Sequence, residues 1–272
     1  MKIRRLLAVV AGTASFAGFG VLTTPNATAA PSWAPAATAT IHPGVQTYTE
    51  GAQCTANFIF TDATDVFIGQ AAHCSGTGAA TETDGCDSAS LPLGTPVEIE
   101  GATRPGVLVY NSWLAMQDEG ETDANTCAYN DFALVRIDPA DHDKVNPSIP
   151  FWGGPVAVGD ATSALETVYS YGNSSLRLGI ELLSPKLGAS LGTDGGGWNH
   201  PVYTVTPGIP GDSGSAFLDR DGNAIGVLST LQLAPLVASN GVSDVGLALD
   251  YARSHGFAVD LEPGTEPFSP IL

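Results

Sequence analysis

The chain has 272 residues, of which 28 are acidic and ten are basic, so its formal net charge at pH 7 is −18. Such an acidic surface repels nucleic acid and anionic lipid, so we expect neither as a partner. The 32 glycines and 19 prolines favour many loops and few helices.

A secretory leader is predicted for residues 1–29. A basic start (Lys2, Arg4 and Arg5) precedes an apolar, uncharged run over 6–22, and Ala-Thr-Ala at 27–29 supplies a cleavage site. A membrane anchor is the first alternative, disfavoured because the run is short and rich in Gly, Ala and Thr. Twin-arginine export is the second, although the residues around the arginine pair match it poorly. Without the leader, seven basic and 28 acidic residues leave a charge of −21.

Residues 30–50 carry Pro, Ala and Thr with little pattern, and we expect a flexible segment or a short propeptide there. Beyond them, short apolar runs separated by turn residues indicate many strands, which favours a barrel or a sandwich. The expected strands are 56–60, 66–70, 96–99, 106–110 and 132–137, followed by 157–158, 167–171, 180–183, 202–205, 214–218, 224–229 and 245–249. A helix is expected only around 247–255.

These strands form two series that divide near residues 138–160, where Asp138-Pro139 and Asn146-Pro147 break the pattern. We therefore predict an N-terminal half at 51–145 and a C-terminal half at 146–272, with a groove between them. The sequence has no alternation of strands and helices, which disfavours an α/β fold.

Four cysteines in an exported chain predict two disulfides. Three pairings are possible, and free thiols are the remaining alternative. We favour Cys54–Cys74, which would tie the strand after Cys54 to the turn before Cys74, together with Cys86–Cys127.

Ser213 is a candidate nucleophile because it lies in Gly-Asp-Ser-Gly-Ser (211–215). Gly211 permits a positive φ, so the amides of Gly211 and Ser213 can converge on the negative oxygen of a tetrahedral intermediate. A serine hydroxyl needs a base to accept its proton and a third group to orient that base. An ordinary serine in a turn is the alternative.

His73 and Asp131 are the candidate base and orienting carboxylate. His73 follows an apolar strand and precedes Cys74, and its ordinary pKa suits proton transfer near neutrality. Asp131 opens the apolar run 132–135, where a carboxylate needs a partner such as a histidine Nδ1; capping of a local turn is its alternative. The other histidines are scattered, so no metal site is predicted, and the acidic run 118–123 is interpreted as a solvated loop rather than a calcium site.

Ala-Ala-His-Cys (71–74), Asn-Asp-Phe-Ala-Leu-Val (130–135) and Gly-Asp-Ser-Gly-Ser (211–215), in this order, resemble the chymotrypsin family of serine peptidases. The resemblance is to its secreted bacterial, actinomycete-type branch and covers about residues 52–256. It implies an all-β fold of two six-stranded antiparallel Greek-key barrels packed perpendicular to each other, with a C-terminal helix and no cofactor. Cys54–Cys74 matches the family's disulfide around the histidine, whereas Cys86–Cys127 has no such support.

The resemblance also implies the role of each site residue. His73 is the base, Asp131 its orienting partner and Ser213 the nucleophile, and the amides of Gly211 and Ser213 form the oxyanion hole. Leu228-Ser229-Thr230 matches the strand that pairs with the substrate backbone. The implied substrate-binding residues are Pro207, Ser229, Thr230 and Leu231.

Three departures from the family bear on specificity, and a fourth bears on activation. Pro207 stands where members that cleave after Lys or Arg carry an acid, and Leu228 stands where glutamate-specific relatives carry a histidine. Leu231 replaces a usual glycine and narrows the pocket, which favours a small or apolar cleaved residue. Asp212 needs a cationic partner, for which Arg104 and Arg177 are equal candidates.

We therefore expect a secreted, extracellular and monomeric serine endopeptidase that acts on protein or peptide substrates and has no membrane contact once the leader is removed. Two alternatives stay open. The first is a catalytically silent homologue that binds protein or cell-wall partners, and the second is an esterase that uses the same triad.

Overall fold

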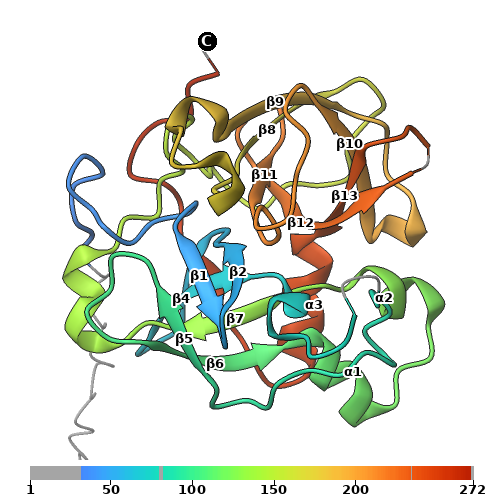
Figure 1. The fold of residues 1–272 in the computed structure, drawn as a ribbon, viewed down its shortest axis with the longest axis horizontal. Helices are drawn as coiled ribbons and strands as arrows, with labels where there is room; N and C mark the ends of the chain where they lie inside the picture. Colours follow the sequence, from blue (N-terminus) through green and yellow to red (C-terminus); the bar gives the residue numbers. More distant parts are fainter. Residues whose placement is uncertain (1–31, 80–81, 234, 271–272) are drawn as a thin grey trace, which may run out of the picture. The chain divides into compact units, whose positions relative to one another are not determined.

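The computed structural model describes residues 32–79, 82–233 and 235–270 (Figure 1). The predicted leader at 1–29 lies outside these residues. The strands form an eight-stranded sheet and a separate closed barrel. Among the described residues, no helix combines the length and the apolar character that a membrane crossing requires.

The sheet is built from the first half of the chain plus one strand from the C-terminus. Its strands are β1 (Gln46–Thr49), β2 (Ala52–Thr55), β3 (Ile59–Thr61), β4 (Val66–Gln70), β5 (Pro96–Ile99), β6 (Gly106–Asn111), β7 (Ala133–Arg136) and β14 (Asp260–Leu261). They are hydrogen-bonded in the order β14-β3-β4-β7-β6-β5-β1-β2.

This sheet is open, which corrects the expectation of a closed six-stranded barrel in the N-terminal half. Within the described part of the chain, β2 pairs with β1 alone and β14 with β3 alone, so the two end strands are not joined there. The chain bends after β2, because the N–H of Asn57 donates to Gly69 O while the N–H of Thr55 donates across to Ser213 O.

The second half forms the expected closed barrel. Its strands are β8 (Thr167–Tyr171), β9 (Pro185–Ser190), β10 (Asn199–Thr204), β11 (Ala216–Leu218), β12 (Ala224–Gln232) and β13 (Ser239–Asp244), and closure follows the order β10-β13-β12-β11-β8-β9. The two sheets therefore draw their strands mainly from residues on either side of the predicted boundary at 145/146, although the exact boundary stays a prediction.

Three expected strands are not strands. Residues 180–183 include the short 3-10 turn η4 (Glu181–Leu183), and 157–158 contribute only an isolated bridge from Val158 to Ala224. Residues 245–249 begin the helix α3 (Val245–Ser254), because the Asp244 carboxylate accepts a hydrogen bond from the Leu247 N–H and caps the helix there.

Residues 30–50 are expected to form a flexible segment or a short propeptide, and their described part, 32–50, packs against the sheet. Cleavage of this segment as a propeptide stays a prediction. The N–H groups of Ala34 and Ile41 donate to the carbonyls of Val145 and Lys144, and Ile41 is fully buried. The segment ends in β1, which pairs with both β2 and β5. Its apolar residues therefore belong to the core of this sheet, a role that its low-complexity composition does not reveal.

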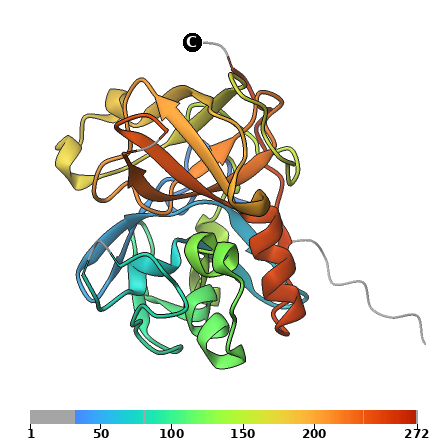
Figure 2. The ribbon, with the colours of Figure 1, turned by 90° about the vertical axis from the view of Figure 1, so that its right-hand side faces the viewer.

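Two short helices that the sequence did not predict follow β6. Asn111 accepts hydrogen bonds from two backbone N–H groups at the start of α1 (Ser112–Glu119), and Asp123 does the same for α2 (Ala124–Tyr129). Helix α3 extends from the barrel toward the sheet (Figure 2), and β14 then pairs with β3. The C-terminal segment thus connects the two sheets.

Candidate functional site

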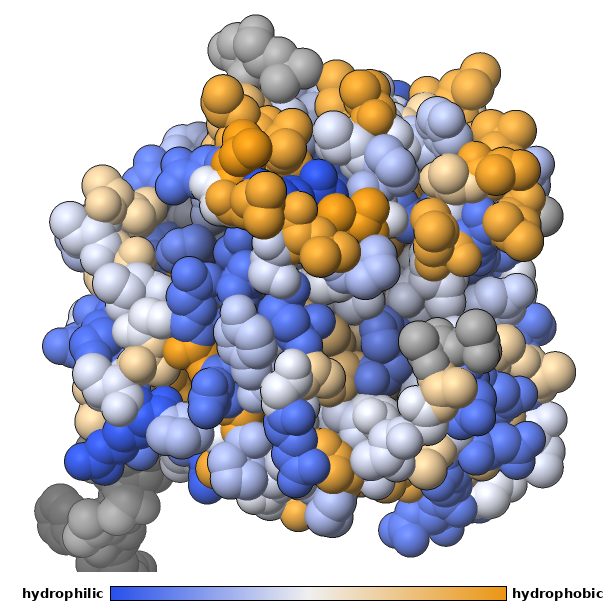
Figure 3. All heavy atoms as spheres, viewed as in Figure 1, coloured by the Kyte–Doolittle hydropathy of each residue, from blue (hydrophilic) through white to orange (hydrophobic). Residues whose placement is uncertain are grey.

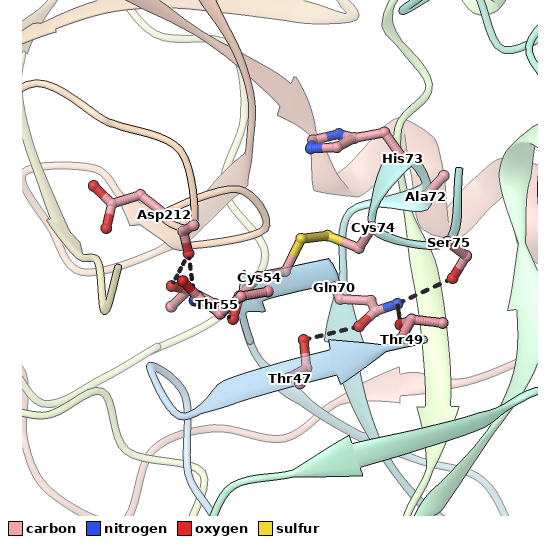
Figure 4. The surroundings of a disulfide bond; sticks show 12 residues. Thr47, Thr49, Cys54, Thr55, Gln70, Ala72, His73, Cys74, Ser75 and Asp212 are labelled. Carbon is pink, nitrogen blue, oxygen red and sulfur yellow. Dashed lines mark hydrogen bonds between the residues drawn. A yellow bond between two sulfur atoms is a disulfide. The ribbon is translucent and has the colours of Figure 1, made fainter. Parts of the chain in front are cut away.

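His73 lies on the one-turn helix η1 (Ala72–Ser75), immediately after β4. The Cys54–Cys74 disulfide joins this turn to β2 beneath the His73 ring (Figure 4). Behind it, the buried Gln70 side chain accepts a hydrogen bond from Thr47 and donates one to Ser75. The backbone of His73 is therefore held firmly, while its side chain keeps 25% of its surface exposed.

Asp131 lies just before β7, with its side chain 5% exposed, and holds His73 in two ways. One carboxylate oxygen is 2.7 Å from His73 Nδ1, and the other accepts the backbone N–H of His73 at 2.9 Å. The Ser229 hydroxyl donates to the first oxygen at 2.6 Å. With Nδ1 facing the carboxylate, the ring's other nitrogen, Nε2, is left as the proton acceptor.

Burial and charge shift the pKa values of His73 and Asp131 in opposite directions. Burial alone raises the pKa of Asp131, but the charge and hydrogen bond of His73 and the hydrogen bond of Ser229 hold that pKa below its usual range. Burial alone lowers the pKa of His73, but the Asp131 charge and hydrogen bond raise it above the ordinary value of 6.5. The pair is thus an anionic carboxylate beside an imidazole of increased basicity.

Ser213 lies on the turn that enters β11, next to the turn of His73. Its carbonyl accepts the Thr55 N–H at 2.8 Å, and the following Gly214 donates to Leu228 O at 2.7 Å. A Cβ on Gly214 would lie 2.4 Å from Thr55 O and 3.1 Å from the backbone nitrogen of Ala71, so a side chain there would prevent this approach. Among the hydrogen bonds of the described residues, none joins the Ser213 hydroxyl to the His73 ring.

The peptide groups on both sides of Gly211 are fixed by side chains. Ser174 Oγ donates to Pro210 O at 2.6 Å, and Gln53 Nε2 and Thr55 Oγ1 donate to Gly211 O at 2.9 and 2.8 Å. Because the C=O and N–H of a planar trans peptide point in opposite directions, the Gly211 N–H points away from Ser174. Gly211 has a φ of +94°, which glycine adopts without strain.

Asp212 is fully buried and is paired with two cations. Arg177 lies 2.5 Å from its carboxylate and Lys186 3.0 Å, and the N–H groups of Ser174 and Ile209 also donate to it. Burial alone raises the pKa of Asp212, but these cations hold it below its usual range. Arg177 is therefore the partner that the sequence left undecided, whereas Arg104 pairs with Asp138 at 3.6 Å.

The four residues expected to bind substrate lie on two segments of the barrel half: Pro207 on the chain that leads to Ser213, and residues 229–231 on β12. Pro207 O accepts hydrogen bonds from Arg177 and Lys186, and Ser229 faces Asp131 as described above. Thr230 O accepts a hydrogen bond from the buried Asn240 side chain at 3.3 Å, and Leu231 is 59% exposed.

Both expected disulfides, Cys54–Cys74 and Cys86–Cys127, are confirmed. Among the residues that the structure describes, two groups of His, Cys and Asp side chains have the spacing of metal ligands, one around His73 and one around Asp84. Each group contains both sulfurs of a disulfide, which are not free thiolates, so neither fits a metal in the oxidised protein.

Several side chains that shape the site were missed by the sequence analysis. Gln53, Thr55 and Ser174 come from segments without a recognisable motif. The sequence gives one weak indication for the fully buried Lys186. It is one of only three lysines in the chain, and it lies on a strand.

No family model and no curated protein matches the chain. Solved structures do match it. Protease A of Thermobifida fusca superimposes with a TM-score of 0.53 at 16% identity, over 82% of this chain and 99% of that one. A glutamic-acid-specific serine protease that uses a histidine triad in substrate binding gives a TM-score of 0.52 at 16% identity, over 82% and 100%. The chain thus has the fold of bacterial chymotrypsin-like serine proteases.

Proposed function

We propose that the protein is a serine endopeptidase that hydrolyses peptide bonds through an acyl-enzyme on Ser213. The observation that carries the proposal is the double attachment of His73 to Asp131, at 2.7 Å through Nδ1 and at 2.9 Å through the backbone N–H. An ordinary ion pair on the protein surface would require neither burial of the carboxylate nor the additional hydrogen bond from the His73 backbone N–H. Together they orient Nε2 as a base.

In the proposed reaction, Ser213 Oγ attacks the scissile carbonyl carbon while His73 Nε2 accepts the hydroxyl proton. The resulting imidazolium is stabilised by the Asp131 carboxylate. His73 then protonates the leaving amine, the peptide bond breaks, and water repeats the sequence on the acyl-enzyme.

The negative oxygen of the tetrahedral intermediate would be bound by the N–H groups of Gly211 and Ser213. This part of the proposal is supported by the fixed Pro210 carbonyl, which shares a peptide plane with the Gly211 N–H and orients it before any substrate arrives. The hydrogen bonds to Gly211 O hold the next peptide group, between Gly211 and Asp212. It is further supported by the buried Asp212 cluster, which anchors the residue between the two amides.

The catalytically silent homologue is favoured by one observation, the missing hydrogen bond between Ser213 and His73 among the described residues. That bond is often long before substrate binds, so its length alone does not decide between the two functions. The ion pairs of Asp212 with Arg177 and Lys186 favour the active enzyme, because they hold the turn that carries Ser213.

Replacement of the nucleophile tests the proposal. Ser213→Ala should abolish hydrolysis of a peptide amide. It should leave the thermal midpoint nearly unchanged, because the substitution removes no hydrogen bond to His73 that the described residues show. The matched control is Ser254→Ala on the exposed face of α3, which should keep full activity. Turnover that survives in the Ser213 variant would contradict the nucleophile assignment, and ester hydrolysis without amide hydrolysis in the unmodified protein would favour the esterase.

A further inference from the structure

We propose that Asn240 closes the base of the pocket that receives the side chain of the cleaved residue, and so restricts cleavage to small uncharged residues such as alanine and glycine. The inference rests on the proposed function. It begins with the place where a substrate chain can bind beside Ser213.

Strand β12 has a free edge at this place. On the side away from β13, its pairing with β11 ends at Val227, opposite Ala216, and Leu228 O is bound by the Gly214 N–H. Beyond Leu228, that edge has no strand partner within residues 32–79, 82–233 and 235–270. An extended peptide can add to such an edge as a further strand, which brings one of its carbonyls to Ser213.

The strands β12 and β13 place Asn240 and Leu231 on one face. These residues are direct partners in the antiparallel pair, so their side chains point to the same side of the sheet. Asn240 Oδ1 accepts the N–H of Gly208 at 2.8 Å, on the segment that leads to Ser213. This face of β12 therefore looks toward segment 206–210, and a substrate side chain beside Ser213 would enter between the two.

The Asn240 side chain spans that space. While its oxygen binds the Gly208 N–H, its nitrogen donates to Thr230 O on β12 at 3.3 Å, so one amide bridges both walls. Asn240 is 2% exposed and Leu231 is 59% exposed, which places the first at the base and the second at the mouth. A Cβ on Gly208 would lie 2.7 Å from Leu228 and 2.9 Å from Asn240, so the base is already tightly filled.

The segment 206–210, which forms the wall of the pocket opposite β12, is fixed by hydrogen bonds from two cations. Lys186 Nζ donates to Thr206 O and Pro207 O at 3.2 and 3.4 Å, and Arg177 donates to Pro207 O at 3.3 Å. Both cations are also bound to the buried Asp212. The wall therefore resists the outward movement that a large side chain would require.

The pocket also lacks a charge that could bind a charged substrate residue. No Asp, Glu, Lys or Arg occurs from Leu228 to Ser243, and the cations behind the wall already pair with Asp212. A substrate Lys or Glu would lose its hydration without gaining a partner. The surface around the mouth is likewise apolar, with exposed Leu233 and Val237, and Figure 3 shows apolar side chains gathered over the barrel.

The test is a set of otherwise identical peptides with Gly, Ala, Leu, Phe, Lys or Glu at the cleaved position. The unmodified protein should cleave after Ala with a kcat/KM at least about tenfold above that for Phe, since a few methylenes in a fitted pocket are worth this much or more. Asn240→Gly should raise the Phe-to-Ala ratio at least about tenfold by opening the base. The control Asn199→Ala, a buried asparagine on the neighbouring strand β10, should leave the ratio unchanged.

Should Asn240→Gly fail to fold, Leu231→Ala at the exposed mouth should still raise cleavage after Leu and Phe. A preference of the unmodified protein for Phe, Lys or Glu, in cleavage that Ser213→Ala abolishes, would overturn the inference and leave the proposed function intact. An unchanged ratio in both pocket variants would also overturn it. Absence of any Ser213-dependent cleavage in the unmodified protein would overturn the proposed function and the inference with it.

Discussion

Asp131 is the residue that determines the orientation of His73 in the site. It is buried, yet three donors reach it: the ring and the backbone of His73 and the hydroxyl of Ser229. A carboxylate buried without such donors would protonate, and would then hold the imidazole in the wrong tautomer. The role of Ser229 in substrate binding stays a prediction, and the structure adds that its hydroxyl donates to the Asp131 carboxylate.

The raised pKa of His73 predicts the pH dependence of hydrolysis. Only the neutral ring accepts the Ser213 proton, so kcat/KM should rise with pH through the pKa of His73 and reach its half-maximum above the ordinary imidazole value of 6.5. Asp131→Asn removes the charge that raises this pKa while burial continues to lower it. The half-maximum should therefore move to lower pH, and the rate should fall steeply. A pH profile of kcat/KM for both proteins checks this, and an unchanged midpoint in the variant would contradict it.

Gln53 is predicted to act as a positioning residue, because its hydrogen bond to Gly211 O fixes the peptide group between Gly211 and Asp212 and so helps to hold the backbone between the two oxyanion amides. Gln53→Met removes the donor to Gly211 O and keeps the length of the side chain, so kcat should fall about tenfold with little change in KM. A smaller loss is expected than the roughly hundredfold to thousandfold loss for removal of an oxyanion donor, because Thr55 still holds the carbonyl.

The matched control for this variant is Gln46→Ala. Gln46 lies on the same hairpin and, like Gln53, donates to Asn173 O, but it does not bond to Gly211. Equal losses in the two variants would mean that the hairpin as a whole, and not the bond to Gly211, sets the rate.

At the scale of elements, periodicity predicted the strands whose residues are apolar and β-branched, such as β4 and β7. It missed β13, whose sequence Ser-Asn-Gly-Val-Ser-Asp is small and polar although every residue is buried. The helices α1 and α2 were missed because they are short and depend on the caps Asn111 and Asp123 rather than on an apolar face. Pairing with neighbouring strands stabilises β13, and capping side chains stabilise the two helices. Neither feature can be recognised from a local hydrophobic pattern.

The two disulfides should differ in their effect on activity. Replacement of Cys54 and Cys74 by serine should lower the free energy of unfolding by about 2–4 kcal/mol and should also lower kcat/KM, because this bridge holds the turn of His73 against β2. The same replacement at Cys86 and Cys127 should destabilise the protein but keep its activity at low temperature. Denaturant unfolding and amide hydrolysis measured on both variants check this; equal activity losses would contradict the link between Cys54–Cys74 and His73.

At the scale of the molecule, the site depends on contacts between the two halves that sequence motifs do not reveal. The motifs identified His73, Asp131 and Ser213 because each has characteristic neighbours. They did not identify Gln53, whose side chain crosses from β2 in the first half to residues 173 and 211 in the second. Within the second half, they also did not identify Lys186, which reaches Asp212 from β9. The return of β14 to β3 was equally hidden, since a strand of two residues carries no periodic signal. Long-range partners of this kind follow from the assembled fold and not from local composition.

The most direct test of the account is labelling of the mature protein with a fluorophosphonate, followed by peptide mapping. The reagent phosphonylates a serine only where a base and an oxyanion site act together. We predict stoichiometric modification at Ser213 alone, lost in His73→Ala and kept in the control His142→Ala, whose ring lies outside the site. Absence of modification at Ser213 in the folded protein would contradict the claim that His73, Asp131 and Ser213 form a catalytic triad.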